Sequence, residues 1–365
     1  MKSVIFYNSL DIFYDPKTKE IPGKELFSAM YDIFSKNITL FDRTGNVQVP
    51  IRCSILPHLE LPKLEQTLSF DEICDNRSRE LLDKANQSNR KIAVMYSGGI
   101  DSTLILCSLM KMSKNQDELN NIVVLLSGHS IKENPNFFYD YIIKKLKCIP
   151  THRFPYYLGN DNYIFITGEN ADQLFGSQVI NGFSLFLGKN KQYNHIDDGS
   201  MIDFIRYKML PNKKHMAERL YIEMNKIVSN APIKLNSMYQ YWWWLNFTTK
   251  WQSVYTRILP YTLNRASLKL EDNYTTFYCS KEFQLWAMNN SDVNTELTAK
   301  ISSKFFPKKY IIEYNKDTEY MNKPKVGSLA NVVMRKESVY TIDSDMNFNS
   351  EFPTDDYFLT DNSFV

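Results

Sequence analysis

The sequence predicts an α/β fold in which a parallel sheet carries helices on both faces. Between residues 91 and 168, short apolar runs alternate with helical patterns, and this alternation is typical of a parallel sheet. The first apolar run also ends abruptly in Ser-Gly-Gly, as a strand does when it turns sharply into a helix. We further expect a small β-rich region before this unit and a helical layer after it.

The region before the sheet, residues 1–68, contains strand-like runs and a turn signal. The runs are SVIFY, ITLF and VQVPIRCSIL, and RTGN at 43–46 is a candidate hairpin turn. A helix is predicted over 69–91, where Ser69 and Glu72 have the spacing of a capping box.

The alternating unit opens a predicted domain over 69–325. The predicted strands are 91–97, 121–128, 151–155 and 162–168, and the predicted helices between them are 101–112 and 134–148. From about residue 184 the pattern is helical and aromatic, and we interpret its tryptophan run, WWW, as helix packing rather than a base-stacking surface. The acidic aromatic tail, 326–365, shows no clear periodicity.

The composition indicates a soluble, cytoplasmic protein. Apolar residues make up 43% of the chain, and a net charge of +2 gives no electrostatic reason to expect a nucleic acid, without excluding one. The 5 cysteines, an odd number without a Cys-x-x-Cys pair, disfavour a disulfide framework or a zinc site. We find neither a signal peptide nor a membrane-length apolar run, so no membrane partner is expected.

The loop after the first predicted strand has the composition of a phosphate site. Ser97, Gly98 and Gly99 lie where parallel sheets bind ligands, and a helix begins near Asp101. Glycines let the backbone approach a ligand closely, and the first N–H groups of the helix, with hydroxyls such as that of Ser102, suit an anion. A carboxylate there repels phosphate unless a cation lies between them, so Asp101 implies Mg²⁺. The alternative is an ordinary glycine-rich turn.

Two motifs carry a family resemblance. SGGIDST at 97–103 resembles the pyrophosphate loop, or PP-loop, of the ATP pyrophosphatase superfamily, whose members adenylate a substrate and release pyrophosphate. YIFITGENADQLFGSQ at 163–178 resembles the Ser/Thr-Gly-Glu-Gly-x-Asp-Glu-Leu-Phe-Gly-Gly segment of asparagine synthetase and β-lactam synthetase. The matching residues are Thr167, Gly168, Glu169, Asp172, Leu174, Phe175 and Gly176, and the departures are Asn170, Gln173 and Ser177.

The second motif predicts acidic chemistry at the same sheet edge. Glu169 and Asp172 are three residues apart, so one helical turn places them on one side. Asp172 is expected to share Mg²⁺ with Asp101, and Glu169 to orient or deprotonate an amine, because neighbouring negative charge raises the pKa of a carboxyl group. The alternative is an acidic first turn that favours the helix dipole. Asn170 tolerates left-handed backbone and is expected to keep the loop shape.

The resemblance implies further contacts with ATP. Ser127 and Gly128, after the second predicted strand, lie where the family contacts adenine and ribose, and Thr167 and Gly168 are expected at the nucleotide as well.

A catalytic lysine is expected near the C-terminal end of the domain. KISSKFFPKKYIIEYNKD at 300–317 resembles the family segment whose lysine stabilises the transition state, and its register selects Lys316. Lys323 and Lys325 are rivals, and solvated surface lysines are the alternative.

The resemblance implies an asparagine synthetase-like, ATP-dependent carbon–nitrogen ligase, or amidotransferase, that adenylates a small-molecule carboxylate or carbonyl. Ammonia or another amine would then attack, displacing AMP. Position 2 is Lys, and the stretch ahead of the loop is too short for a glutaminase domain, so nitrogen would come from free ammonia, another amine or a separate glutaminase partner. The alternatives are an ATP pyrophosphatase that modifies a DNA or RNA base or nucleotide, and a degenerate ATP-binding module.

Overall fold

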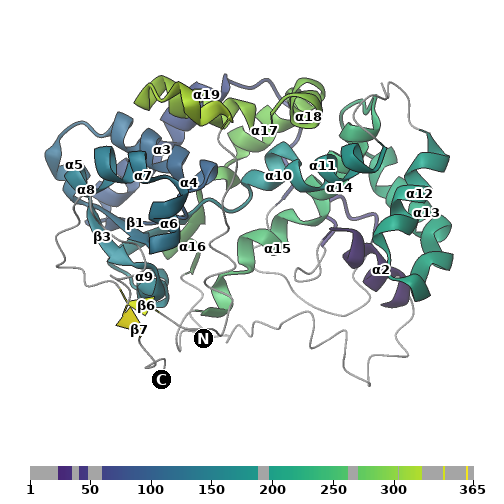
Figure 1. Ribbon diagram of the computed structural model, residues 1–365, viewed down its shortest axis with the longest axis horizontal. Helices are drawn as coiled ribbons and strands as arrows, with labels where there is room; N and C mark the ends of the chain where they lie inside the picture. The colour runs from purple at the N-terminus through teal and green to yellow at the C-terminus, as the bar shows by residue number, and fades with distance from the viewer. Residues whose placement is uncertain are drawn as a thin grey trace.

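A five-stranded, all-parallel sheet lies on one side of the molecule (Figure 1). The computed structural model describes residues 24–34, 41–47, 60–187, 197–261, 270–302, 304–322, 340–341 and 359–360. The strand order is β3-β2-β1-β4-β5, with β1 in the centre. The strands are β1 (Lys91–Met95), β2 (Ile122–Leu126), β3 (Lys147–Pro150), β4 (Tyr163–Thr167) and β5 (Tyr274–Thr276). The predicted α/β class with a parallel sheet is confirmed.

Helices make up most of the remaining described structure. The α-helices are α2 (Lys24–Phe34), α3 (Phe70–Gln87), α4 (Ile100–Met112), α5 (Gln116–Asn120), α6 (Gly128–Glu133), α7 (Pro135–Phe137), α8 (Ile143–Lys145), α9 (Phe154–Leu158), α10 (Ala171–Phe175), α11 (Ser177–Leu187), α12 (Asp198–Lys208), α13 (Ala217–Ser229), α14 (Met238–Thr249), α15 (Trp251–Thr256), α16 (Leu270–Asn273), α17 (Lys281–Asn289), α18 (Ser291–Lys300) and α19 (Phe305–Asn315). The structure also contains one π-helical turn among the described residues, η2 (Phe138–Ile142). The 3₁₀ turns are η3 (Thr151–Arg153), η4 (Pro211–Met216), η5 (Leu259–Tyr261), η6 (Phe277–Cys279) and η7 (Thr318–Asn322). In the described part of the chain, no helix has the length and apolar character needed to cross a bilayer.

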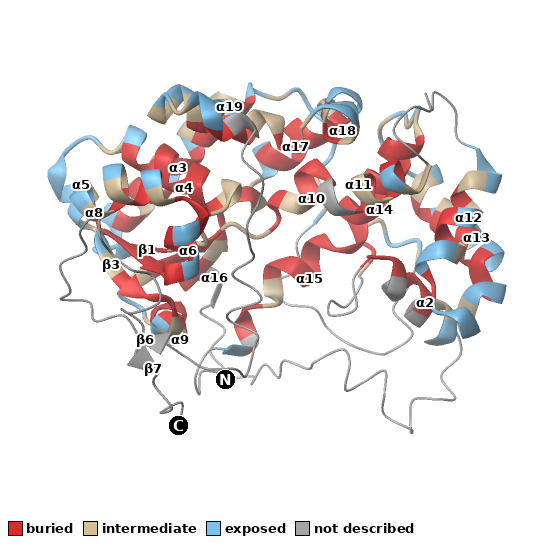
Figure 2. Ribbon diagram, viewed as in Figure 1, coloured by how far each residue is buried: buried red, intermediate tan, exposed pale blue. Residues whose placement is uncertain are grey.

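Both faces of the sheet are covered, because successive side chains of a strand point to opposite sides. On β1, Ile92 and Val94 belong to a large core that includes buried residues of α3, α4 and α19. Ala93 belongs to a second, smaller core with α9 and η5. The two cores together place the strands inside the molecule, as Figure 2 shows.

The predicted helical layer is confirmed by α11–α14, which α2 also contacts. In Figure 1, α10 and α15 lie between the sheet and this layer. Every residue of α14 is buried, and the indole rings of Trp242, Trp243 and Trp244 are fully enclosed. The tryptophan run is therefore core, as the sequence predicted, and it fixes the helical layer against the elements that follow β4.

The prediction of a strand at 151–155 is wrong. The strand is β3, which ends at Pro150, and 151–155 instead begins η3 and α9. Pro155 lies in the first turn of α9, where a missing N–H costs nothing. The helix predicted over 134–148 accordingly ends earlier, at Lys145, after the π-helical turn.

The start of the chain contains a helix that the β-rich prediction did not include. α2 buries Ala29, Met30, Ile33 and Phe34, which are spaced to lie on one helical face. A turn is present at 43–46, and its predicted place in a hairpin stays a prediction. Most of the residues in the three predicted strand runs lie outside the described residues, so those strands stay predictions.

The predicted domain limits stay predictions as well. The helix expected from 69 begins at Phe70, with Ser69 as its N-cap and the predicted capping box with Glu72 present. Of the predicted tail, only β6 (Tyr340–Thr341) and β7 (Leu359–Thr360) are described, and they form an antiparallel pair.

Candidate functional site

The loop between β1 and α4 lies at the carboxyl end of the central strand and depends on one glycine. Gly98 has a φ of +77°, a left-handed conformation that side chains disfavour. A Cβ atom there would lie 2.2 Å from the carbonyl oxygen of Ser130 and 2.6 Å from the Cβ of Glu133, both on α6. The loop is therefore pressed against the helix that follows β2, and only glycine fits.

The hydroxyls of Ser97 and Ser102 form hydrogen bonds within the loop. The backbone N–H of Ser97 donates to Oγ of Ser102 at 3.1 Å, and the two Oγ atoms are 3.0 Å apart. The N–H of Gly99 donates to Oγ of Ser97 at 3.3 Å. The hydroxyls of Ser97 and Ser102, which were expected to contact an anion, thus lie within one turn of backbone at the start of α4 and bond each other and two amides of the loop.

The loop after β4 packs directly on this first loop. A Cβ on Gly168 would lie 3.1 Å from the Cβ of Asp101. Asn170 has a φ of +68°, so the predicted left-handed conformation is confirmed. Its side chain donates to the carbonyl of Trp251 at 2.8 Å and accepts from Oγ1 of Thr276 at 3.0 Å. Asn170 thereby ties the β4 loop to α15 and β5.

A lysine that the sequence analysis did not select joins the two predicted metal ligands. Lys304, the N-cap of α19, forms ion pairs with Asp101 and, at 2.6 Å, with Asp172. The lysine side chain is only 9% exposed. Burial lowers the pKa of this ammonium, but the two carboxylates more than offset that effect, so its pKa lies above the ordinary value. Lys304 is therefore fully charged at neutral pH.

A second ion pair lies beside the first. Glu169, which follows β4, pairs with Arg257, which follows α15. Burial raises the pKa of the Glu169 carboxyl, Arg257 partly offsets this, and Asp172 and Asp101 add to the rise. The acidic groups also affect Lys250. Burial lowers the pKa of Lys250 to about 8, and Asp172 opposes this shift. The site therefore brings acidic and basic side chains close to one another.

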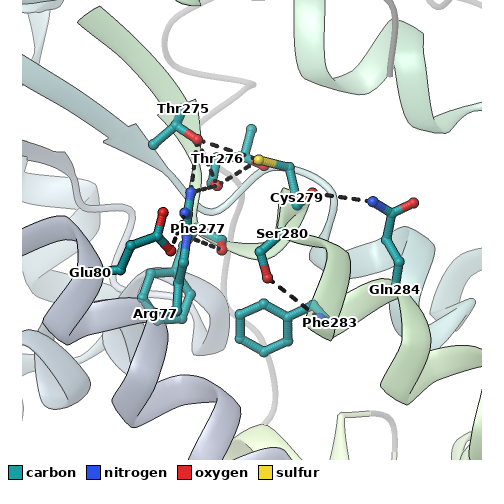
Figure 3. Close-up of polar contacts among 9 residues, drawn as sticks. All are labelled: Arg77, Glu80, Thr275, Thr276, Phe277, Cys279, Ser280, Phe283 and Gln284. Carbon is teal, nitrogen blue, oxygen red and sulfur yellow. Dashed lines mark hydrogen bonds and ion pairs between the residues drawn. The ribbon is translucent and has the colours of Figure 1, made fainter. Parts of the chain in front are cut away.

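The first turn of α4 is braced from η6. The hydroxyl of Tyr278 donates to the backbone carbonyl of Asp101 at 3.0 Å. Arg77 of α3 holds η6 in place, since its Nε donates to the carbonyl of Phe277 at 3.2 Å and its Nη2 to Oγ1 of Thr275 at 2.9 Å (Figure 3). The brace is built from residues outside both sequence motifs.

The predicted nucleotide residues after β2 begin the next helix at the same sheet edge. Ser127 is the N-cap of α6, with its Oγ 3.2 Å from Oγ of Ser130, and Gly128 is buried in the first turn. Because α6 also contacts Gly98, these residues are neighbours of the first loop. Thr167, the last residue of β4, has its hydroxyl 3.3 Å from that of Tyr274.

Lys316 is placed elsewhere. It is the exposed C-cap of α19, and its Nζ donates to the carbonyl of Glu313 at 2.6 Å. Lys304 and Lys316 cap opposite ends of one helix, which separates their backbones by roughly 18 Å. The contacts described for Lys316 do not join it to Asp101, Asp172 or Glu169. Its rivals Lys323 and Lys325 lie outside the described residues.

The two aspartates fit Mg²⁺ under one condition. Their carboxylates converge on the same ammonium, so they are close enough to ligate one ion, and two carboxylates completed by phosphate oxygens and water are a suitable donor set. The ammonium of Lys304 occupies the point between them, so an ion fits there only when that ammonium moves. Over the described residues, no group of three or more His, Cys, Asp or Glu side chains offers another metal site.

The site residues missed by the sequence analysis are Lys304, Arg257 and Tyr278. None carries a local signal, because each reaches the site through tertiary contacts from a separate helix or turn. Comparisons with known proteins add no assignment: no family model matches the chain, and no curated protein matches it significantly.

Proposed function

We propose that the chain is an asparagine synthetase-like, ATP-dependent carbon–nitrogen ligase that adenylates a substrate carboxylate or carbonyl. One observation carries the proposal: Asp101, after β1, and Asp172, after the adjacent β4, converge on one positive charge, the ammonium of Lys304. Loops at the carboxyl ends of adjacent parallel strands are the usual ligand site of such sheets. A glycine-rich turn with two hydroxyls beside converging carboxylates suits a metal-bound polyphosphate.

Each group near the loop has a role in this proposal. Ser97, Gly98, Gly99 and Ser102 would hold the phosphates, and Asp101 and Asp172 would hold Mg²⁺, which supplies charge neutralisation when bound. A substrate carboxylate oxygen attacks the α-phosphorus of ATP, and pyrophosphate leaves. The nitrogen of ammonia or another amine then attacks the activated carbonyl carbon, and AMP leaves with the electrons of the broken C–O bond.

Glu169 has the environment of a general base in the second step. An attacking amine must lose a proton, and a carboxylate with a raised pKa accepts it more readily than an ordinary one. Arg257 pairs with the carboxylate and opposes complete neutralisation. Burial thus strengthens Glu169 as a base, while Arg257 favours the ionised form that can accept the proton.

The test follows which products ATP gives. The purified protein is incubated with Mg-ATP, ammonium and a panel of carboxylic acids, amino acids and nucleotides, and AMP with pyrophosphate is distinguished from ADP with phosphate. We expect substrate-dependent AMP and pyrophosphate, lost in Asp101→Asn and reduced at least tenfold in Glu169→Gln. Asp140→Asn is the matched control, since Asp140 is exposed and pairs with Lys144 at 3.3 Å. Formation of ADP would overturn the proposal.

A second candidate, an ATP-binding module without chemistry, is favoured by one observation. The ammonium of Lys304 lies where the catalytic metal is expected. A site that uses this ammonium permanently in place of Mg²⁺ would bind ATP and not turn it over. Metal-independent ATP binding with no product across the whole panel would select this second candidate.

A further inference from the structure

Lys304 occupies a position that can hold only one cation. Asp101 and Asp172 come from loops after two different strands, and both form an ion pair with the ammonium of Lys304. Two carboxylates so close repel each other strongly without a cation. The two negative charges are balanced by one divalent ion, whereas an ammonium alone leaves one negative charge over. A divalent ion and the ammonium at the same point would repel each other.

We propose that Lys304 is a displaceable internal cation: its ammonium fills the divalent-cation site of Asp101 and Asp172 in the metal-free protein and leaves when the metal enters. The assignment of Mg²⁺ as that metal rests on the proposed function. In this role Lys304 competes with the metal directly, so the free protein binds divalent ions weakly and gains affinity only with a ligand, such as a polyphosphate, that adds negative charge.

The backbone around Lys304 suits a local movement. The residue has a φ of +60°, and such a left-handed conformation in a non-glycine residue persists only where the surroundings hold it. The ion pairs with Asp101 and Asp172 provide that hold. Loss of the pairs lets the first turn of α19 relax.

The body of α19 is anchored independently of this turn. The hydroxyl of Tyr310 bonds the carboxylate of Asp75 on α3, and Ile311 is fully buried in the large core. Displacement of the ammonium therefore requires rearrangement of the N-terminal end of α19 and leaves its packing on α3 and α4 intact.

The test uses Mn²⁺ alone as the probe, with no nucleotide present. Titration followed by electron paramagnetic resonance of free Mn²⁺ gives the affinity of each variant. We expect Lys304→Met to bind one Mn²⁺ at least tenfold more tightly than the unmodified chain, and Lys304→Arg to resemble the unmodified chain. Asp172→Asn in the Lys304→Met background should remove the gain. Lys309→Met is the matched control, because Lys309 is exposed on the same helix and pairs with Glu313 at 3.6 Å.

Thermal unfolding provides a second measurement that does not depend on catalysis. Without metal, Lys304→Met should unfold at a lower temperature than the unmodified chain, because its two carboxylates have lost their counter-ion. Added Mg²⁺ should raise that temperature in Lys304→Met and leave the unmodified chain nearly unchanged, since binding to the folded state alone stabilises it. Lys304→Gln keeps the test open if the methionine variant does not fold.

Equal Mn²⁺ affinity in Lys304→Met and the unmodified chain would overturn the proposal, and so would tight Mn²⁺ binding by the unmodified chain. These outcomes are distinct from failure of the proposed function, which is read from AMP and pyrophosphate. A chain that never adenylates a substrate can still show competition between Lys304 and a metal.

Discussion

The hydroxyl of Tyr278 and the backbone carbonyl of Asp101 are joined by a hydrogen bond of 3.0 Å. Tyr278 lies in η6, far along the chain from the β1–α4 loop. Arg77 of α3 donates to the carbonyl of Phe277 in η6 and to the hydroxyl of Thr275 in the preceding β5. The conformation of the predicted phosphate loop therefore depends on a residue outside the loop. A chain that kept SGGIDST but lost this brace would have a less ordered site.

Tyr278→Phe removes the hydroxyl and keeps the buried ring. We expect the free energy of unfolding to fall by about 1 kcal/mol, the usual net contribution of one hydrogen bond. Urea denaturation followed by circular dichroism measures the loss. Tyr156→Phe is the control, because the Tyr156 side chain is largely exposed and should change stability very little. Equal stability of Tyr278→Phe and the unmodified chain would show that the bond does not brace the loop.

Gly98→Ala and Gly99→Ala form a matched pair. Alanine at 98 combines a left-handed backbone with an overlap on the Ser130 carbonyl, and we expect a loss of about 3 kcal/mol in unfolding free energy. Alanine at 99 meets only Oγ of Ser97 at 3.3 Å, with an ordinary negative φ of −74°, so the loss should stay under about 1 kcal/mol. Chemical denaturation of both variants gives the comparison. Similar losses would mean that α6 does not confine the loop as described.

The parts of the fold that depend on residues close together in the sequence could be predicted from local patterns. β1 and α4 were predicted because an apolar run, two glycines and a second apolar run follow one another directly. The segment 151–155 was predicted to be a strand, in keeping with its threonine and phenylalanine. It instead begins a helix, whose first turn accommodates Pro155. β5 gave no signal at all: it is three residues long and joins the sheet edge beside β4 from more than a hundred residues later.

The candidate site likewise contains residues that local motifs predict and residues that they do not. Asp101, Glu169 and Asp172 belong to compact motifs, so their types and spacing were readable. Lys304 lies 203 residues beyond Asp101, and nothing in its neighbourhood says that this end of α19 meets the sheet edge. Register with a family pattern selected Lys316 instead, at the other end of the helix. Which end of a helix approaches a site is decided by tertiary packing, which a single sequence does not display.

Arg43 connects the residues at 41–47 to the helical layer. Its Nη1 donates to Oε1 of Gln284 at 2.7 Å and its Nη2 to the carbonyl of Phe247 at 2.9 Å, while the guanidinium lies 4.7 Å from the ring centre of Trp251. Arg43→Met keeps much of the stem and removes these bonds. We expect a loss of about 2 kcal/mol in unfolding free energy, since hydrogen bonds from charged donors are the stronger kind.

The comparison for Arg43 is Arg219→Met, at an exposed position of α13. Both variants are measured by urea denaturation, and the exposed one should lose less than about 0.5 kcal/mol. An equal loss in the two variants would show that Arg43 is no more than a solvated surface cation.

The Glu169–Arg257 pair predicts how the proposed reaction responds to pH. The proposed base must be ionised, and burial raises its pKa above the ordinary 4.5, so the rate should fall as pH drops through that raised pKa. Arg257 acts in the opposite direction.

Arg257→Gln removes the charge of Arg257, which should raise the pKa of Glu169 further and move the acid limb of the pH–rate profile to higher pH by about one pH unit. Arg257→Lys retains a charge and should leave the limb closer to its original position. Pyrophosphate release measured from about pH 4 to about pH 9, a range that begins near the ordinary carboxyl pKa, gives the profile. An acid limb that stays in place in Arg257→Gln would contradict the assignment of Glu169 as the base.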